Sequence, residues 1–184
     1  MDLRKERTLK LLSESLIALL HEKPYSNVTV SEICEGAMVR RATFYRHFSG
    51  KNDLLAYTVA ARRAQLDVQV DPDGTMPLPE YCHNMTKEFL RLVDEHRTMI
   101  RKRSLSPEFA FVNSLLADEL SRQFERKLAE RTGREIPDGR LRELASFYAN
   151  GLVGTVGQYA ATPEEADEGE LLDFIDDVAR RLFA

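Results

Sequence analysis

The segment that most constrains this chain runs from Thr29 to Phe48 and reads TVSEICEGAMVRRATFYRHF. Thr29 and Glu32 are spaced as a capping box, in which the threonine oxygen and the glutamate carboxylate each accept a hydrogen bond from the other residue's backbone amide. Val28 and Ile33 occupy the hydrophobic staple positions on either side of that cap. This pattern predicts a short helix that begins just after Thr29.

A second short helix is predicted from Arg40 to Phe48, after a tight break at Met38. Phe44 and Phe48 are four residues apart and therefore share one helical face. If Phe44 points inward, Ala42 and Arg46 point outward. Two short helices with a tight break, the second basic and aromatic, predict a helix-turn-helix whose second helix lies in a DNA major groove.

The same residues resemble the DNA-binding segment of the tetracycline-repressor-like (TetR) family at many fixed positions. The matching residues are Thr29, Ile33, Ala37, Val39, Thr43, Phe44, Tyr45, His47, Phe48, Lys51, Leu54 and Leu55. The resemblance covers about the first third of the chain. It implies an all-α fold, a homodimer, a palindromic double-stranded DNA operator and a small-molecule effector that switches DNA binding.

Three positions depart from the family pattern. Met38 stands where the family has a turn glycine, so we expect a methionine in a left-handed backbone conformation, which is strained for that residue. Arg40 replaces a capping serine, which removes an N-cap oxygen and adds a cation. Cys34 replaces an alanine and is interpreted as a small buried residue.

The candidate DNA-binding residues form two groups. Arginine binds guanine with two hydrogen bonds and a methyl group contacts thymine, so we expect base contacts from Arg40, Arg41, Ala42 and Arg46. Phosphate contacts, which set register, are expected from Thr29, Thr43, Tyr45, His47 and Lys51. The alternative interpretation is a solvated basic face on a small helical bundle.

The overall net charge of −4 is unfavourable for nucleic-acid binding, but the charge is unevenly distributed. Residues 1–70 hold 11 Lys and Arg against 8 Asp and Glu, whereas residues 71–184 hold 15 against 22. At ordinary ionic strength, salt screens the electric field of a charged side chain beyond about 10 Å, so only nearby charges affect a DNA-binding surface. A basic N-terminal region on an acidic chain is therefore compatible with phosphate contact.

Apolar residues at helical spacing predict about nine helices and no strands. We expect a helix-turn-helix DNA-binding domain at 1–68, a linker at 69–79 that is rich in Pro, Asp and Gly, and a ligand-binding and dimerisation domain at 80–184. Beyond the linker, helices are expected near 80–95 and 98–103, after Ser106–Pro107, near 140–161 and near 168–183. The helix that starts after Ser106–Pro107 is expected to end at Thr132–Gly133. A loop at 134–139 then separates it from the helix near 140–161.

The last two predicted helices are apolar enough to suggest a dimer interface of four helices, two from each chain. We expect that interface to include Leu152, Val156, Phe174, Val178 and Leu182, with Gly151, Gly154 and Gly157 allowing close approach. Packing within the chain's own core is the alternative.

A ligand pocket is implied by the resemblance. The candidates are Tyr81, His83, Met85, Phe89, Phe109, Asn113, Phe124 and Tyr148, with Met99, Phe111, Asn150 and Gln158 as further possibilities. For each single residue, ordinary core packing is the alternative interpretation.

Catalysis has little support, and no cofactor or metal is expected. The four histidines are scattered, and Cys82 and His83 diverge on a helix. Two distant cysteines, no apolar leader and no run of membrane length predict a cytoplasmic protein without a membrane partner.

The function predicted is a DNA-binding regulator, with repression favoured over activation. The competing hypothesis is an adaptor or coactivator of the same fold that binds a protein instead of an operator.

Overall fold

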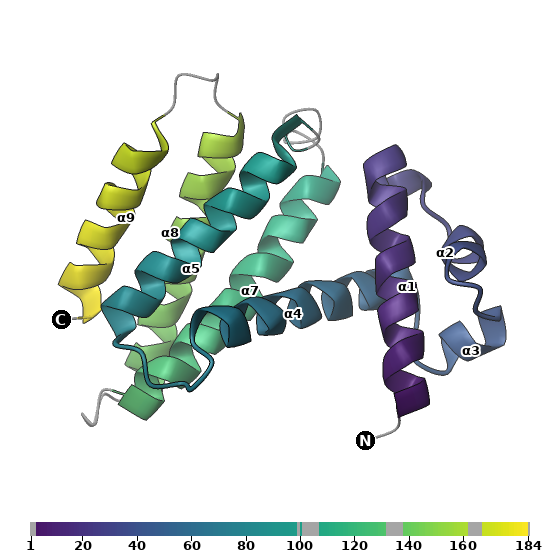
Figure 1. Ribbon diagram of the computed structural model, residues 1–184, viewed down its shortest axis with the longest axis horizontal. Helices are drawn as coiled ribbons and strands as arrows, with labels where there is room; N and C mark the ends of the chain where they lie inside the picture. The colour runs from purple at the N-terminus through teal and green to yellow at the C-terminus, as the bar shows by residue number, and fades with distance from the viewer. Residues whose placement is uncertain (1–2, 99, 101–106, 132–137, 162–166, 184) are drawn as a thin grey trace. The chain divides into compact units, whose positions relative to one another are not determined.

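A computed structural model describes residues 3–98, 100, 107–131, 138–161 and 167–183, and all regular structure in these ranges is helical (Figure 1). The described α-helices are α1 (Leu3–Glu22), α2 (Val30–Gly36), α3 (Arg41–Tyr45), α4 (Lys51–Val70), α5 (Leu78–Glu95), α7 (Pro107–Arg131), α8 (Asp138–Ala161) and α9 (Glu168–Phe183). The expected all-α fold is confirmed for these residues. None of these helices is long and apolar enough to cross a bilayer. The short helix expected at 98–103 lies mostly outside the described residues.

Contacts within the chain define a head, Met1–Ala61, and a body, Arg62–Ala184. The boundary falls inside α4, which is one continuous helix. Most of the stretch expected as a linker is ordered locally. α4 continues to Val70, a turn follows in which the amide of Gly74 donates to the carbonyl of Asp71 at 3.2 Å, and α5 begins at Leu78. The functional assignment of the two parts stays a prediction.

The head has its own apolar core. Its buried side chains are Leu9, Leu12, Leu16, Tyr25, Val28, Ile33, Cys34, Ala37, Phe44, Phe48, Leu54 and Leu55. The two staple residues expected from the sequence, Val28 and Ile33, are among them. This core holds the short helices α2 and α3, which at seven and five residues are too short to be stable in isolation.

α1 and α2 approach closely at Gly36. The hydroxyl of Ser15 donates to the carbonyl of Ile33 at 2.9 Å, which joins the two helices through a buried bond. A Cβ at position 36 would lie 2.5 Å from the Ser15 oxygen, closer than real Cβ atoms come. A side chain at position 36 would therefore displace the Ser15 hydroxyl and disrupt its bond to Ile33.

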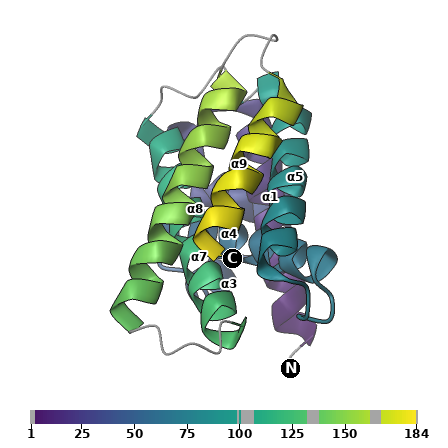
Figure 2. The ribbon, with the colours of Figure 1, turned by 90° about the vertical axis from the view of Figure 1, so that its left-hand side faces the viewer.

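The body is a helical bundle in which α7 packs along α8 and α5 contacts α7, α8 and α9 (Figures 1 and 2). An aromatic run lies at its centre, with the rings of Tyr81 and Phe124 at 6.1 Å and those of Phe124 and Tyr148 at 4.7 Å between centroids. All three rings are at most 3% exposed. Burial of rings of this size is a main source of core stability.

Candidate nucleic-acid interface

α2 begins with the capping box that its sequence predicts. The Thr29 hydroxyl oxygen accepts from the Glu32 amide at 3.3 Å, and a Glu32 carboxylate oxygen accepts from the Thr29 amide at 2.9 Å. Lys23 forms an ion pair with the same carboxylate. The Lys23 ammonium, followed by the Thr29 hydroxyl and amide, lowers the pKa of Glu32 to about 2.

The turn between α2 and α3 is built around Met38, whose φ is +53°. The Val39 amide donates to the Cys34 carbonyl at 2.9 Å and the Met38 amide donates to the Glu35 carbonyl at 3.0 Å. These two bonds form a Schellman motif, in which Met38 occupies the position that usually holds glycine. The expected left-handed conformation is confirmed, and the side chain is 90% exposed.

α3 is anchored by its two phenylalanines. Phe44 is fully buried, Phe48 is 5% exposed, and their ring centroids are 5.6 Å apart. Arg40 is the N-cap residue but makes no side-chain capping bond. Phe44 points inward, and Ala42 and Arg46 are exposed to solvent, as the sequence predicts. Arg40, Arg41 and Tyr45 are exposed as well.

This outward surface is positively charged. None of Arg40, Arg41 and Arg46 forms an ion pair with a carboxylate in the described part of the chain. Arg46 donates to the Thr43 hydroxyl at 3.3 Å, and the ring of His47 lies against that of Phe48 at 6.5 Å between centroids. Exposed guanidinium groups free of internal carboxylates can bind base edges or phosphates.

Lys51, which is expected to contact a phosphate, forms hydrogen bonds within the head. Its ammonium donates to the carbonyls of Tyr25, Ser26 and Val28 at 2.9, 3.1 and 2.9 Å. An ammonium has three donors, so all of them are used within the head. The Thr29 amide, expected at a phosphate, is likewise bound to Glu32. These bonds stabilise the entry to α2, and the phosphate contacts expected of both residues stay predictions.

The residues expected to line a ligand pocket lie at several places in the body. Tyr81, Met85, Phe124 and Tyr148 are buried in its core, as the core-packing alternative would have them. His83 instead faces Asp176 of α9, with 2.6 Å between Nδ1 and a carboxylate oxygen. The remaining candidates, Phe89, Phe109 and Asn113, are half-buried.

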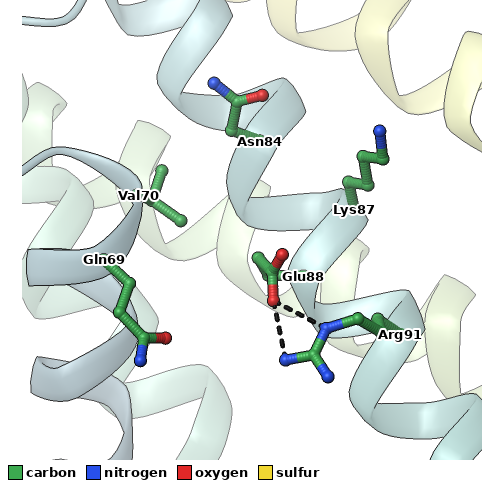
Figure 3. Close-up of a pocket in the computed structure, with 6 residues that line it drawn as sticks. All are labelled: Gln69, Val70, Asn84, Lys87, Glu88 and Arg91. Atoms are coloured by element: carbon green, nitrogen blue, oxygen red, sulfur yellow. Dashed lines mark hydrogen bonds and ion pairs between the residues drawn. The ribbon is translucent and has the colours of Figure 1, made fainter.

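An open groove of about 610 Å³ lies between α4 and α5 within the body (Figure 3). It is lined by Gln69, Val70, Asn84, Lys87, Glu88 and Arg91. Arg91 donates to Glu88, one turn earlier on α5, at 2.9 Å. None of the expected pocket residues lines it. The sequence offered no signal for this groove, because polar residues on α5 are indistinguishable from an ordinary solvated face.

The residues expected in a dimer interface also separate into two groups. Leu152 and Val156 are 4% and 0% exposed, because they pack in the core of their own chain, so they offer no area to a partner. Phe174 is 59% exposed, and Val178 and Leu182 are half-buried.

Phe147, at 69% exposed, was not among the expected interface residues. Its spacing of four and seven residues from Gly151 and Gly154 places it on their helical face and would have identified it. Around both glycines, an added Cβ would meet open space.

Comparisons with known proteins agree with this geometry. Residues 14–58 match the sequence profile described as "Bacterial regulatory proteins, tetR family". An uncharacterized HTH-type transcriptional regulator of Bacillus subtilis is 35% identical over 66 residues, which are 35% of this chain and 17% of that protein. One from Mycobacterium bovis is 32% identical over 75 residues, 41% of this chain and 35% of its own length. The matches therefore span about a third or less of these relatives.

The fold is shared over nearly the whole chain. The crystal structure of a TetR transcriptional regulator from Rhodococcus sp. RHA1 superposes with a TM-score of 0.68 and 16% identity, covering 98% of both chains. A TetR regulator from Streptococcus agalactiae gives 0.59 and 23% identity, covering 97% of this chain and 96% of that one. Residues 14–58 thus carry the sequence segment of the TetR-family regulators, and the chain as a whole has the fold of the solved TetR-family structures.

Proposed function

We propose that this protein is a cytoplasmic, DNA-binding transcriptional regulator that binds a partly palindromic operator as a homodimer. The observation that carries the proposal is the outward surface of the α3 segment, where Arg40, Arg41 and Arg46 are exposed while Phe44 is buried in the head core. A basic helix fixed to a small helical domain through its apolar face is the arrangement with which helix-turn-helix proteins enter the major groove.

The side chains of this surface are suited to different parts of the duplex. Arg41 and Arg46 carry planar guanidinium groups that match the O6 and N7 acceptors of guanine, and the Ala42 methyl suits the thymine methyl. Thr43, Tyr45 and His47 are suited to phosphate oxygens, which set the register of the protein on the helix. Lys51 and Thr29 contribute by holding the head together, since their donors are already bonded.

A homodimer is supported by the exposed aromatic residues of α8 and α9. Phe147 and Phe174 are each more than half exposed, so a partner that covers them would bury apolar area. The open space around Gly151 and Gly154 on α8 permits a partner backbone to approach. Two heads related by a two-fold axis read two half-sites, about one helical turn apart or slightly more.

We favour repression over activation, because a dimer spanning two half-sites excludes other proteins from that stretch of DNA. Release by a small molecule bound in the body is the simplest switch. α4 carries Leu54 and Leu55 in the head core and Arg63 and Asp67 in the body, so a ligand that displaces α4 acts on both parts. A duplex accepts one spacing between two heads, so such a displacement lowers affinity.

The competing function is an adaptor that binds a protein instead of DNA. Met38 has a strained positive φ, and Arg40, the N-cap residue of α3, makes no capping bond. Both residues help to position α3, which motivates this alternative. It predicts no preference for any duplex.

Selection of bound duplexes from a random pool at low salt, read by gel shift, separates the two functions. We expect enrichment of a symmetric site with two half-sites. Recovery of no common sequence, or of an asymmetric single site, would overturn the dimeric regulator. The matched control is the variant Arg41→Ala with Arg46→Ala, which removes two exposed cations and leaves the buried residues of the head intact.

A further inference from the structure

Arg63, on the body part of α4, is a buried cation whose donors are mostly unused. The residue is 4% exposed, and its Nη2 donates to the Tyr81 hydroxyl at 2.5 Å. Its Nε and Nη1 atoms are buried and have no hydrogen-bond partner among the described residues. Leaving three charged N–H donors unpaired inside a protein is unfavourable, so this position calls for an acceptor.

The neighbouring carboxylates are already paired with other groups. Asp67 accepts from the Tyr81 hydroxyl at 2.8 Å and lies 3.4 Å from the Lys127 ammonium. Asp71 accepts from the same ammonium at 2.8 Å. Arg126 also lies 3.7 Å from Asp67. Among the described residues, this cluster therefore holds three cations, Arg63, Arg126 and Lys127, and two carboxylates, Asp67 and Asp71, which leaves one positive charge in excess.

The cluster stands at the polar end of the central aromatic run. Tyr81 connects the two, because its hydroxyl receives the Arg63 bond while its ring contacts Phe124, which in turn contacts Tyr148. A cation with free donors beside a wall of aromatic rings suits a molecule with one anionic group and an apolar remainder.

We propose that Arg63 binds the carboxylate of an acidic effector whose apolar part lies against Tyr81, Phe124 and Tyr148. A guanidinium matches a carboxylate in planarity and charge, which an ammonium does not. This inference rests on the proposed function and specifies the chemical class of its effector. Because the rings now contact one another, the effector must separate them, and it does so beside α4, the helix that also contributes to the head.

The open groove between α4 and α5 is a weaker site for the same anion. Its arginine, Arg91, is already bonded to Glu88 and to Glu95. Its side chain is 52% exposed, so water satisfies its remaining donors. Binding an anion therefore satisfies more unpaired hydrogen-bond donors at Arg63 than at Arg91.

Matched acids and amides test the site without DNA. The probes are octanoate against octanamide, 4-phenylbutyrate against 4-phenylbutanamide and 1-naphthylacetate against 1-naphthylacetamide, each titrated while the melting temperature of the full chain is followed. We expect at least one acid to raise the melting temperature well above the effect of its amide. Arg63→Gln should abolish that preference, and Arg122→Gln, an exposed arginine on α7, should retain it.

Acids and amides that shift the wild-type protein equally, or that fail to shift it, would overturn the proposal. So would an acid preference that survives in Arg63→Gln. If Arg63→Gln does not fold, Arg63→Lys serves in its place, because it keeps the charge but loses the planar fork, and it should weaken the preference.

The melting temperature of the ligand-free protein gives an independent result. Arg63→Met removes an unpaired buried charge, so we expect a melting temperature equal to or above that of the wild type. A marked fall would show that Arg63 is a structural residue and would contradict the proposal. Duplex binding without any acid tests the proposed function separately, so failure of one leaves the other measurable.

Discussion

The ammonium of Lys51 lies 2.9 Å from the backbone carbonyl oxygen of Tyr25 and 4.6 Å from the centroid of the Tyr25 ring. Lys51, the first residue of α4, thereby holds the segment that connects α1 to α2 through direct contacts. The Tyr25 hydroxyl donates back to the Asn52 side chain at 2.5 Å, so the two segments are joined by reciprocal contacts. This arrangement makes Lys51 a stabilising residue of the head.

Replacement of Lys51 by Met should destabilise the head by about 2 kcal/mol, because bonds from a charged donor contribute about 1.5–3 kcal/mol each and this site is partly exposed. Urea denaturation followed by circular dichroism measures the change. Lys10→Met, on the exposed face of α1, is the control and should shift stability by less than about 0.5 kcal/mol. A Lys51→Met protein of unchanged stability but weakened DNA binding would support the phosphate contact instead.

Met38→Gly should stabilise the protein. A side chain at positive φ costs roughly 1–2 kcal/mol, and the greater freedom of glycine in the unfolded chain offsets about half of the stabilisation, leaving a gain of about 0.5–1 kcal/mol. Met38→Ala retains the Cβ and should show no such gain. Thermal unfolding of the three proteins measures this. Equal stability of Met38→Gly and Met38→Ala would mean that the turn is not strained.

The lowered pKa of Glu32 gives the capping box a pH dependence. A carboxyl group whose pKa falls from 4.5 to about 2 on folding stabilises the protein above pH 4.5, and this contribution is lost as pH falls from there to about 2. The stability difference between wild type and Glu32→Gln should therefore shrink over that interval. Glu35→Gln, on the same helix, is the comparison. A difference that stays constant with pH would contradict the assigned bonds.

Local patterns predicted the parts of the head that depend on neighbouring residues. The capping box at Thr29, the left-handed turn at Met38 and the inward Phe44 all follow from short spacings, because each is decided within one or two helical turns. The sequence did not predict the bonds of Lys51 within the head, because its three acceptors lie 23 to 26 residues earlier in the chain. No local pattern reports such a contact.

The same limit applies to the body. α8 is apolar on more than one face, so periodicity alone could not decide that Leu152 faces the core while Phe147 faces outward. The cluster around Arg63 joins three helices and depends on Lys127, which is distant in sequence. Arg63 stood out in no motif, because buried charges are recognisable only when the packing around them is known.

The exposed phenylalanines should hold a dimer together, whereas Leu152 should stabilise each chain. Phe174→Glu places a charge in the proposed interface, so we expect the mass in solution to fall toward the 21.0 kDa of one chain with its helical content retained. Leu152→Ala should instead cost about 2–5 kcal/mol of stability. Light scattering and urea denaturation measure the two effects. A monomeric wild type, or a dimer unaffected by Phe174→Glu, would exclude this interface.

The central claim is that the outward surface of the α3 segment reads duplex DNA, and the salt dependence of binding to the selected duplex tests it most directly. For the wild type, we predict that log K falls with log salt with a slope steeper than about −3, as expected when several phosphates are neutralised. Arg41→Ala should weaken the selected duplex by about 1–3 kcal/mol and relax the preference at one base position. A flat salt dependence, together with equal binding of the selected and unrelated duplexes by both proteins, would contradict the account.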